Sequence, residues 1–459
     1  MKIFLESLGC SRNQVDSEIM LGKLLAVGHT ITEDPSLAEV IIVNTCGFIS
    51  TALDEAVDVI LEMAEYKKTG TCRRLIAAGC LAQRYKDDPD LSSTLPEVDA
   101  FLGTAACDNI VDAVENKDIH PMILFPEPKQ RPFYNFSEKR ALLNHYYAYV
   151  KVSEGCNRKC TYCIIPKLRG TQRSKPVQDI VMECEDLVQR GVKEVILTAE
   201  NTTDYGLNYV RDRDPNQDQN RAAGISDKTK DGKDFNQVIK RVAQTLEHNN
   251  TDSHPAWVRF LYAHPETLTE SLIHTVANHP NICPYYDVPI QHASPKILKK
   301  MGRHYKTEDL YTLFDTIRRI DPAAALRTTL IVGFPGETQR DFDILMQFIK
   351  DIRFDHLGVF VYSDSDDIQS HTFKDKVPHN TARIRHDQIM EAQNKISLSI
   401  NEGHIGKIYD VLVEENPEPG LYIGRTMFQA PEVDGVTFIY AEGLETAGFV
   451  KVKINDAFE

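Results

Sequence analysis

Three cysteines in one short loop constrain this 459-residue chain more than any other feature of its sequence. They are Cys156, Cys160 and Cys163, with the spacing C-x3-C-x2-C. Three thiolates this close together can bind three irons of a four-iron, four-sulfur cluster and leave the fourth iron without a protein ligand. The loop therefore predicts an iron–sulfur site with an open iron, where another molecule can bind and react.

Other roles for these cysteines fit the pattern less well. A zinc site usually pairs C-x2-C with a second C-x2-C or an H-x3-5-H motif, and neither follows nearby. An odd number of crowded thiols does not suit disulfides. A buried apolar role does not suit a segment that also contains Asn157, Arg158 and Lys159. The iron–sulfur site therefore remains the best-supported interpretation of the loop.

Length and composition narrow the class of protein. The length predicts two to four domains, and a hydrophobic content of 42% is enough for packed cores. No apolar run reaches the length of a membrane span, and the first residues do not resemble a signal peptide. We therefore expect the chain in the cytosol, where its ten cysteines stay reduced and available for metal.

The chain is acidic, with a formal net charge of -15. This is the opposite of a chain built to coat phosphate backbones, although acidity also serves solubility. The charge favours a basic protein partner over free nucleic acid.

The first 110 residues alternate between apolar runs and helical patterns. Strands are expected at residues 1–8, 38–44 and 75–78, and helices at 15–27 and 50–64. Repeated units of this size predict a doubly wound α/β domain with a parallel sheet, at residues 1–118.

A second set of cysteines follows the three expected strands of this domain. Cys10, Cys46 and Cys80 each come just after a strand and beside a glycine. Because open α/β sheets bind ligands at the carboxyl ends of their strands, three thiols at these positions predict a second three-cysteine site. Each cysteine taken alone could be an ordinary small residue at a strand end.

A proline-rich stretch at residues 119–141 is expected to link this domain to a central one at residues 142–392. The expected strands of the central domain are 145–152, 194–199, 257–262, 285–289, 326–332 and 356–362. Helical patterns between them predict a partial (β/α)6 barrel with its site at the C-terminal strand ends. The cysteine loop follows the first strand and so lies at that end, and residues 200–203 and 291–294 also end strands there.

Two other stretches have distinct compositions. Residues 208–233 are polar and are expected to form a surface insertion in the central domain. Residues 393–459 predict a small β domain, with strands at 408–413, 421–425, 436–440 and 449–454. Residues 395–459 contain eleven acidic and five basic side chains, whereas a domain that binds RNA is expected to be basic.

The cysteine loop resembles that of the radical S-adenosylmethionine enzymes, in its spacing, in Tyr162 and in the Ile164-Ile165-Pro166 that follows. In that superfamily the open iron binds S-adenosylmethionine, and the reduced cluster cleaves it to a 5'-deoxyadenosyl radical. The resemblance implies that Cys156, Cys160 and Cys163 bind a 4Fe-4S cluster. Residues 329–337 resemble the segment that supports the adenine, so Tyr162, Gly333 and Phe334 are candidate contacts of S-adenosylmethionine.

The whole chain further resembles the methylthiotransferases of this superfamily. The resemblance rests on Ser7-Leu8-Gly9-Cys10, Val43-Asn44-Thr45-Cys46-Gly47, Arg169-Gly170-Thr171-Gln172-Arg173-Ser174 and Gly424-Arg425-Thr426, the last of which resembles a TRAM domain. It implies an auxiliary 4Fe-4S cluster on Cys10, Cys46 and Cys80. It also implies two uses of S-adenosylmethionine, one to methylate a sulfur and one to make the radical, and the need for an electron donor and a sulfur donor.

Residues 163–170 and 287–294 look most like the RimO-type branch. That branch modifies the β-carbon of an aspartate in the S-twelve protein of the small ribosomal subunit, so nucleic acid is not expected as the substrate. Two alternatives remain open. One is the MiaB-type branch, which modifies an adenosine of transfer RNA, and the other is an iron–sulfur electron carrier or scaffold without catalytic turnover.

Overall fold

The computed structural model describes residues 1–116, 120–133, 139–207, 234–248 and 254–458. The insertion expected at 208–233 lies outside these residues. The chain divides into two compact units. The first comprises Met1–Leu143, Ser153–Arg158 and Cys163–Lys175, and the second comprises Asn144–Val152, Lys159–Tyr162 and Pro176–Glu459. Within the described ranges, no helix has both the length and the apolar character needed to cross a membrane.

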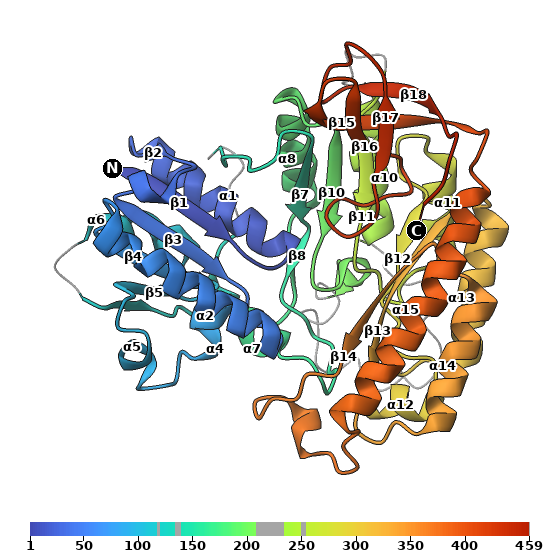
Figure 1. Ribbon diagram of the computed structural model, residues 1–459, viewed down its shortest axis with the longest axis horizontal. Helices are drawn as coiled ribbons and strands as arrows, with labels where there is room; N and C mark the ends of the chain where they lie inside the picture. Colours follow the sequence, from blue (N-terminus) through green and yellow to red (C-terminus); the bar gives the residue numbers. More distant parts are fainter. Residues whose placement is uncertain (117–119, 134–138, 208–233, 249–253, 459) are drawn as a thin grey trace, which may run out of the picture. The chain divides into compact units, whose positions relative to one another are not determined.

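A six-stranded parallel sheet forms the centre of the first unit, in the order β2-β1-β3-β4-β5-β6 (Figure 1). Its strands are β1 Lys2–Ser7, β2 Thr30–Ile31, β3 Val40–Thr45, β4 Arg74–Gly79, β5 Ala100–Leu102 and β6 Met122–Leu124. The doubly wound α/β prediction is confirmed. The edge strand β6 lies within the stretch for which a linker was expected.

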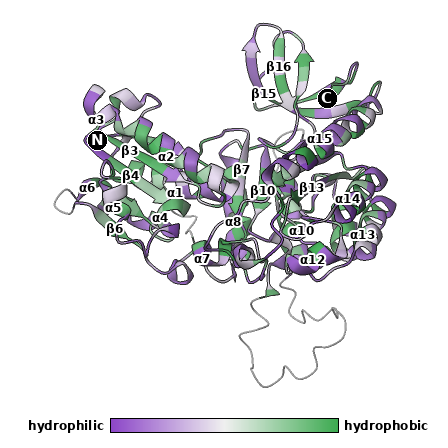
Figure 2. Ribbon diagram, turned by 60° about the horizontal axis from the view of Figure 1, so that its bottom comes forward, coloured by the Kyte–Doolittle hydropathy of each residue, from purple (hydrophilic) through white to green (hydrophobic). Residues whose placement is uncertain are grey.

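Both faces of this sheet are buried under helices. The helices of the unit are α1 Ser11–Ala26, α2 Ser50–Ala64, α3 Tyr66–Thr69, α4 Cys80–Arg84, α5 Leu91–Thr94, α6 Ile110–Glu115 and α7 Ile165–Arg169. Because side chains alternate along a strand, Ile41 packs with the α2 side chains while Ile42 packs with Met20 of α1 on the other face. Strands β3 and β4 are accordingly mostly hydrophobic (Figure 2), with polar residues only at the end of β3 and at the start of β4.

The barrel of the second unit is built from two three-stranded parallel sheets, β7-β10-β11 and β12-β13-β14. The strands are β7 Tyr147–Lys151, β10 Glu194–Thr198, β11 Trp257–Phe260, β12 Tyr285–Asp287, β13 Ala325–Val332 and β14 His356–Val361. A parallel bridge between Val258 and Ile282 continues the pairing from one sheet to the other. This confirms the partial (β/α)6 barrel.

Helices cover the outside of the barrel strands (Figure 1). They are α8 Val177–Gln189, α10 Phe235–His248, α11 Glu270–Asn278, α12 Pro295–Lys300, α13 Thr307–Ile320, α14 Gln339–Ile352 and α15 His379–Glu402. Helix α14 begins at Gln339 because Thr338 caps it. The Thr338 hydroxyl accepts from the Asp341 backbone N–H, and the Asp341 carboxylate accepts from the Thr338 backbone N–H.

The C-terminal domain is a four-stranded antiparallel sheet in the order β17-β16-β15-β18. Its strands are β15 Ile408–Glu418, β16 Leu421–Arg425, β17 Thr437–Tyr440 and β18 Phe449–Lys453, around a core that includes Val411 and Tyr422. The small β domain predicted from the sequence is confirmed.

This domain packs against the N-terminal ends of the barrel strands. The buried Glu194 carboxylate, at the start of β10, lies 2.5 Å from Arg259 Nε and 2.7 Å from Arg425 Nη2. Asp434 accepts a 2.6 Å hydrogen bond from the Tyr285 hydroxyl at the start of β12 and lies 3.3 Å from Arg327 Nε. Contacts of the C-terminal domain therefore occupy the end of the barrel opposite the C-terminal strand ends, where the site was predicted.

Candidate functional site

The three N-terminal cysteines lie at the carboxyl ends of three neighbouring strands. Cys10 follows β1 and is the N-cap of α1, Cys46 follows β3, and Cys80 follows β4 and begins α4. Strands β1, β3 and β4 are consecutive in the sheet and parallel, so their carboxyl ends meet at one edge. The structure thus brings together the cysteines that the sequence placed after separate strands.

Two glycines allow this close approach. A Cβ atom at Gly9 would lie 2.8 Å from Cys46 Cβ and 3.1 Å from Cys46 Sγ. A Cβ atom at Gly47 would lie 2.9 Å from the carbonyl carbon of Cys80. Any larger residue at either position would push the cysteine segments apart.

The thiols of this trio differ in acidity because their surroundings differ. Burial, together with the charges of Cys10 and Cys46, raises the pKa of Cys80 to about 12, although Arg169 opposes this. Burial also raises the pKa of Cys46. Burial acts in the same direction on Cys10, but the charges of Arg12 and Arg169 and backbone N–H groups outweigh it and lower the pKa. Binding of a metal to all three sulfurs would therefore release protons.

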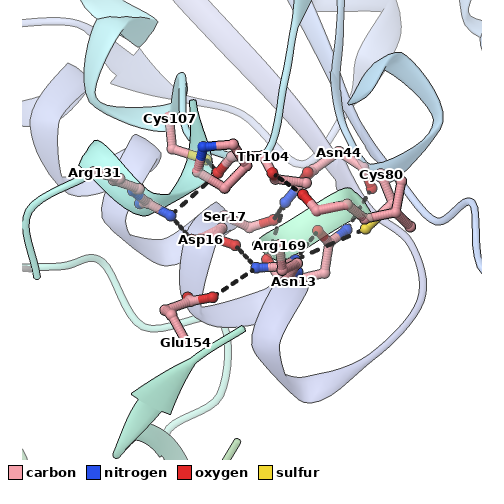
Figure 3. Close-up of polar contacts among 12 residues, drawn as sticks. Asn13, Asp16, Ser17, Asn44, Cys80, Thr104, Cys107, Arg131, Glu154 and Arg169 are labelled. Carbon is pink, nitrogen blue, oxygen red and sulfur yellow. Dashed lines mark hydrogen bonds and ion pairs between the residues drawn. The ribbon is translucent and has the colours of Figure 1, made fainter. Parts of the chain in front are cut away.

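An amide bracket, formed by Asn13 and Asn44, ties the loops of these cysteines together (Figure 3). The Asn13 side-chain amide donates to the carbonyl groups of Leu8 at 2.7 Å and Asn44 at 3.1 Å. The Asn44 amide donates to the Asn13 carbonyl at 2.9 Å and to the Ser17 hydroxyl at 2.8 Å. Sequence reasoning missed this bracket. Its only sequence signal is an amide residue in each of two cysteine-bearing segments.

The loop of Cys156, Cys160 and Cys163 begins and ends in the first unit. The Cys156 N–H donates to the Gly170 carbonyl at 3.1 Å, and the Arg158 N–H approaches Cys156 Sγ at 3.4 Å. The short strands β8 Ser153–Glu154 and β9 Arg173–Ser174 pair on either side of this segment. Helix α7 begins two residues after Cys163, and its Leu168 carbonyl accepts a 2.6 Å hydrogen bond from Thr104.

The middle of the loop is fixed within the second unit. The Thr161 N–H and hydroxyl donate to the carbonyl groups of Met301 at 3.0 Å and Lys300 at 2.9 Å. The Tyr162 hydroxyl accepts from Arg303 Nη2 at 2.8 Å, and its ring meets Phe334 edge-on with a centroid distance of 6.5 Å. The backbone around Cys160 is thus held by the end of α12, a brace that the sequence did not reveal.

Two of the candidate S-adenosylmethionine contacts, Gly333 and Phe334, lie at the carboxyl end of β13. Their N–H groups both donate to one Glu337 carboxylate oxygen, at 2.6 and 3.2 Å. The Phe334 ring is fully buried, and a Cβ atom at Gly333 would lie 2.5 Å from Ala382 Cβ. These contacts account for a glycine and a phenylalanine here by packing alone, and contact with S-adenosylmethionine stays a prediction.

Polar groups at two other strand ends differ in how they are satisfied. At the end of β10, the Asn201 amide and the Thr202 hydroxyl are buried and have no hydrogen-bond partner among the described residues. At the end of β12, His292 Nδ1 accepts from the Ser294 N–H at 2.9 Å. Burial, with the charge of Arg385, lowers the His292 pKa to about 3, so this imidazole is neutral and held in place. Among the described residues at these two strand ends, the Asn201 amide, the Thr202 hydroxyl and His292 Nε2 are buried polar groups without a hydrogen-bond partner.

The two cysteine sets remain the predicted ligands of two iron–sulfur clusters. Across the residues that the structure describes, no three His, Cys, Asp or Glu side chains converge as the ligands of one metal ion. A four-iron cluster instead takes each thiolate on a different iron, so its ligands lie further apart. All ten cysteines lie in the described part of the chain and none forms a disulfide. Each set thus has the thiol chemistry that such a cluster requires.

Comparisons with known proteins find relatives along the whole chain. Family models match residues 2–103 (uncharacterized protein family UPF0004), 150–349 (radical SAM superfamily) and 405–459 (TRAM domain). Among curated relatives, the ribosomal protein uS12 methylthiotransferase RimO of Desulfosudis oleivorans is 44% identical, and the match covers all of this chain and 98% of that protein. The protein of the same name from Clostridioides difficile is 41% identical, with 100% and 97% covered.

A solved structure shares the fold at low sequence identity. The radical S-adenosylmethionine methyltransferase TsrM from Kitasatospora setae aligns with a TM-score of 0.54 and 11% identity, over 96% of this chain and 85% of that one. At this identity the match supports the architecture only.

Proposed function

Because this chain belongs to the RimO family of ribosomal protein uS12 methylthiotransferases, we propose that it transfers a methylthio group to a ribosomal protein. The proposed substrate is the S-twelve protein of the small subunit, and the proposed position is the β-carbon of an aspartate. The observation that carries this proposal is the identity of 37–44% to relatives of that name over nearly the whole chain.

The cofactors are S-adenosylmethionine and 4Fe-4S clusters, as the radical SAM match and the family imply. We assign Cys156, Cys160 and Cys163 to the cluster that binds S-adenosylmethionine, and Cys10, Cys46 and Cys80 to an auxiliary cluster. When bound, these groups supply a radical that removes a hydrogen atom and a methylated sulfur that replaces it. Tyr162, Gly333 and Phe334 remain the proposed contacts of S-adenosylmethionine.

The protein's own groups prepare this chemistry. Thr161 and Tyr162 hold the middle of the cysteine loop through hydrogen bonds to the end of α12 and to Arg303. Asn201 and Thr202 offer buried polar atoms at the carboxyl end of β10, where a polar ligand would satisfy them. A cavity that excludes water protects a carbon radical from side reactions.

The proposed domain boundaries follow the sequence: residues 1–118 for the auxiliary cluster, 119–141 as a linker, 142–392 for radical chemistry and 393–459 for the TRAM domain. We also propose a cytoplasmic location, an electron donor and a sulfur donor as partners. The acidic C-terminal domain supports a basic protein substrate, since a domain that binds RNA is expected to carry positive charge.

Mass spectrometry of a strain that lacks the gene tests the substrate. The account predicts that the ribosomal S-twelve protein loses the mass of one methylthio group and that the plasmid-borne gene restores it, while transfer RNA nucleosides stay unchanged. Loss of a methylthiolated adenosine with an intact ribosomal protein would instead favour the MiaB-type alternative. If both substrates keep their modification, the non-catalytic alternative is favoured.

A further inference from the structure

Arg169 links the C-terminal end of the cysteine-loop segment to the auxiliary cysteines within the first unit (Figure 3). It is the last residue of α7, and only 3% of its surface is exposed. Its Nη2 atom lies 3.9 Å from Cys80 Sγ and 3.4 Å from Asn13 Oδ1. A buried guanidinium therefore faces one of the sulfurs assigned to the auxiliary cluster.

Carboxylates hold the other side of this guanidinium. Arg169 Nη1 lies 2.9 Å from Asp16 Oδ2 and 3.5 Å from Glu154 Oε2. The second Asp16 oxygen, Oδ1, lies 2.7 Å from Nη1 of Arg131. Arg169 and Arg131 thus share one buried carboxylate. Nη2, the nitrogen of Arg169 that faces the sulfur, is distinct from the one held by the carboxylates.

The backbone that carries Arg169 is fixed as well. The Thr104 hydroxyl donates to the Leu168 carbonyl at 2.6 Å, one residue before Arg169. The Cys156 N–H donates to the Gly170 carbonyl at 3.1 Å, one residue after it. The guanidinium therefore has little freedom to turn away from Cys80.

A cation in this position changes the energy of an iron–sulfur cluster. A cluster on three thiolates gains one more negative charge when it is reduced, and hydrogen bonds to its sulfurs and nearby positive charge favour that state. The effect is strong in a buried site because the effective dielectric constant is low.

We propose that Arg169 is a positioning residue of the auxiliary cluster: its guanidinium, held by Asp16 against Cys80 Sγ, raises the reduction potential of that cluster. The proposal rests on the assignment of Cys10, Cys46 and Cys80 under the proposed function. Arg169 lies six positions after Cys163, in the motif of the radical domain. The proposal gives it a role at the other cysteine site.

The test uses the full chain with Cys156, Cys160 and Cys163 replaced by Ala, so that one cluster remains. Its midpoint potential is measured by an anaerobic redox titration followed by electron paramagnetic resonance. We expect Arg169→Met to weaken one-electron reduction about tenfold, which is a drop of about 59 mV. Arg169→Lys should lower the midpoint potential much less than Arg169→Met does, because lysine keeps the positive charge.

Arg131→Met is the matched control, since Arg131 binds the same carboxylate, and its side chain also contacts Asp108 and the Thr104 carbonyl rather than a cysteine assigned to either cluster. An unchanged potential in Arg131→Met, beside a lowered one in Arg169→Met, supports the proposal. Equal potentials in the parent and Arg169→Met overturn it.

If Arg169→Met binds no iron, Arg169→Gln is compared with Arg169→Lys. A lower potential in the Gln variant then supports the proposal, whereas equal potentials, or loss of iron in both, overturn it.

The parent protein separates this test from that of the proposed function. A three-alanine parent that binds no iron after reconstitution contradicts the assignment of Cys10, Cys46 and Cys80 itself. A parent with a normal cluster and a potential that does not respond to Arg169 contradicts only the role of Arg169.

Discussion

Two buried carboxylates in this protein each lie between two arginines, and the comparison shows how one arrangement serves two purposes. Asp16 lies between Arg169 and Arg131 in the first unit. Glu194 lies between Arg259 and Arg425 in the second. A carboxylate between two guanidinium groups attracts both of them, and the positive charge that remains needs a further acidic partner inside a protein.

The two triads differ in what the arginines contact beyond the carboxylate. Arg259 also donates to the Met427 carbonyl, and Arg425 to Glu414 and to the Gln429 carbonyl, so this triad joins the C-terminal domain to the barrel. Arg169 instead extends to a cysteine sulfur. The Glu194 triad is therefore architectural, whereas the Asp16 triad holds a cation next to a proposed ligand of iron.

The largest expected effect is that of removing Asp16. Asp16→Ala takes the nearest carboxylate from two buried arginines, which retain longer contacts to Glu154 and Asp108, and this costs about 3–5 kcal/mol of unfolding free energy. It also releases Arg169 from its position beside Cys80. Urea unfolding of the metal-free protein should show the loss, and iron per chain after reconstitution should fall. A variant with normal stability and full iron would contradict the role given to this triad.

Glu194→Ala should cost a similar free energy, about 3–5 kcal/mol, because it takes a buried carboxylate from Arg259 and from Arg425, although Arg425 keeps Glu414. At a temperature where the variant is folded, its iron content per chain should equal that of the parent protein. Glu391→Gln removes a carboxylate from an exposed helical pair with Lys395 and serves as the control, with no measurable loss expected. Selective loss of auxiliary iron from the Glu194 variant would contradict the claim that only the Asp16 triad acts on the auxiliary site.

Asn13→Ala should have a smaller effect, about 1–3 kcal/mol, since it removes the side-chain donor to the Leu8 and Asn44 carbonyl groups, of which the Asn44 carbonyl keeps the Leu8 N–H. The bracket joins the segments of Cys10 and Cys46, so iron at the auxiliary site should also be lost faster to a chelator. Asn416→Ala, at an exposed position of β15 in the C-terminal domain, is the comparison. Equal rates of iron loss in the two variants would mean that the bracket does not organise the cysteines.

The smallest effect concerns pH. Burial opposes ionisation of Glu194, but the charges of Arg259 and Arg425 outweigh it and hold the folded pKa below the ordinary 4.5. The unfolded chain therefore binds more protons near that pH, and stability rises with pH through this range. The contribution is fully present above pH 4.5 and is lost as the pH falls through the folded pKa. Glu194→Gln should flatten this dependence in urea titrations between pH 3 and 6, and an unchanged slope would contradict it.

Sequence patterns predicted the parts of this molecule that depend on local periodicity. The continuous apolar runs of β3 and β4, and a cysteine just after each expected strand, were enough to predict a parallel sheet with thiols at one edge. Strands of two or three residues, such as β2 and β5, were missed because they are too short to show a period.

Neither triad could be found in this way. Arg169 and Asp16 are 153 residues apart, and Arg425 meets Glu194 across two domains. Buried charges follow no apolar period, and in a single sequence they look like surface residues. The resemblance of residues 169–174 to the methylthiotransferases marked Arg169 as part of a motif, but only the fold shows that it lies beside Cys80.

The central claim is that the two cysteine sets form separate clusters with separate tasks, and iron content measured together with S-adenosylmethionine cleavage tests it most directly. The reconstituted protein should contain about eight irons. Cys80→Ala and Cys160→Ala should each contain about half as many, and only Cys80→Ala should still release 5'-deoxyadenosine from S-adenosylmethionine. Cleavage that survives in Cys160→Ala, or iron content that does not fall in Cys80→Ala, would contradict the account.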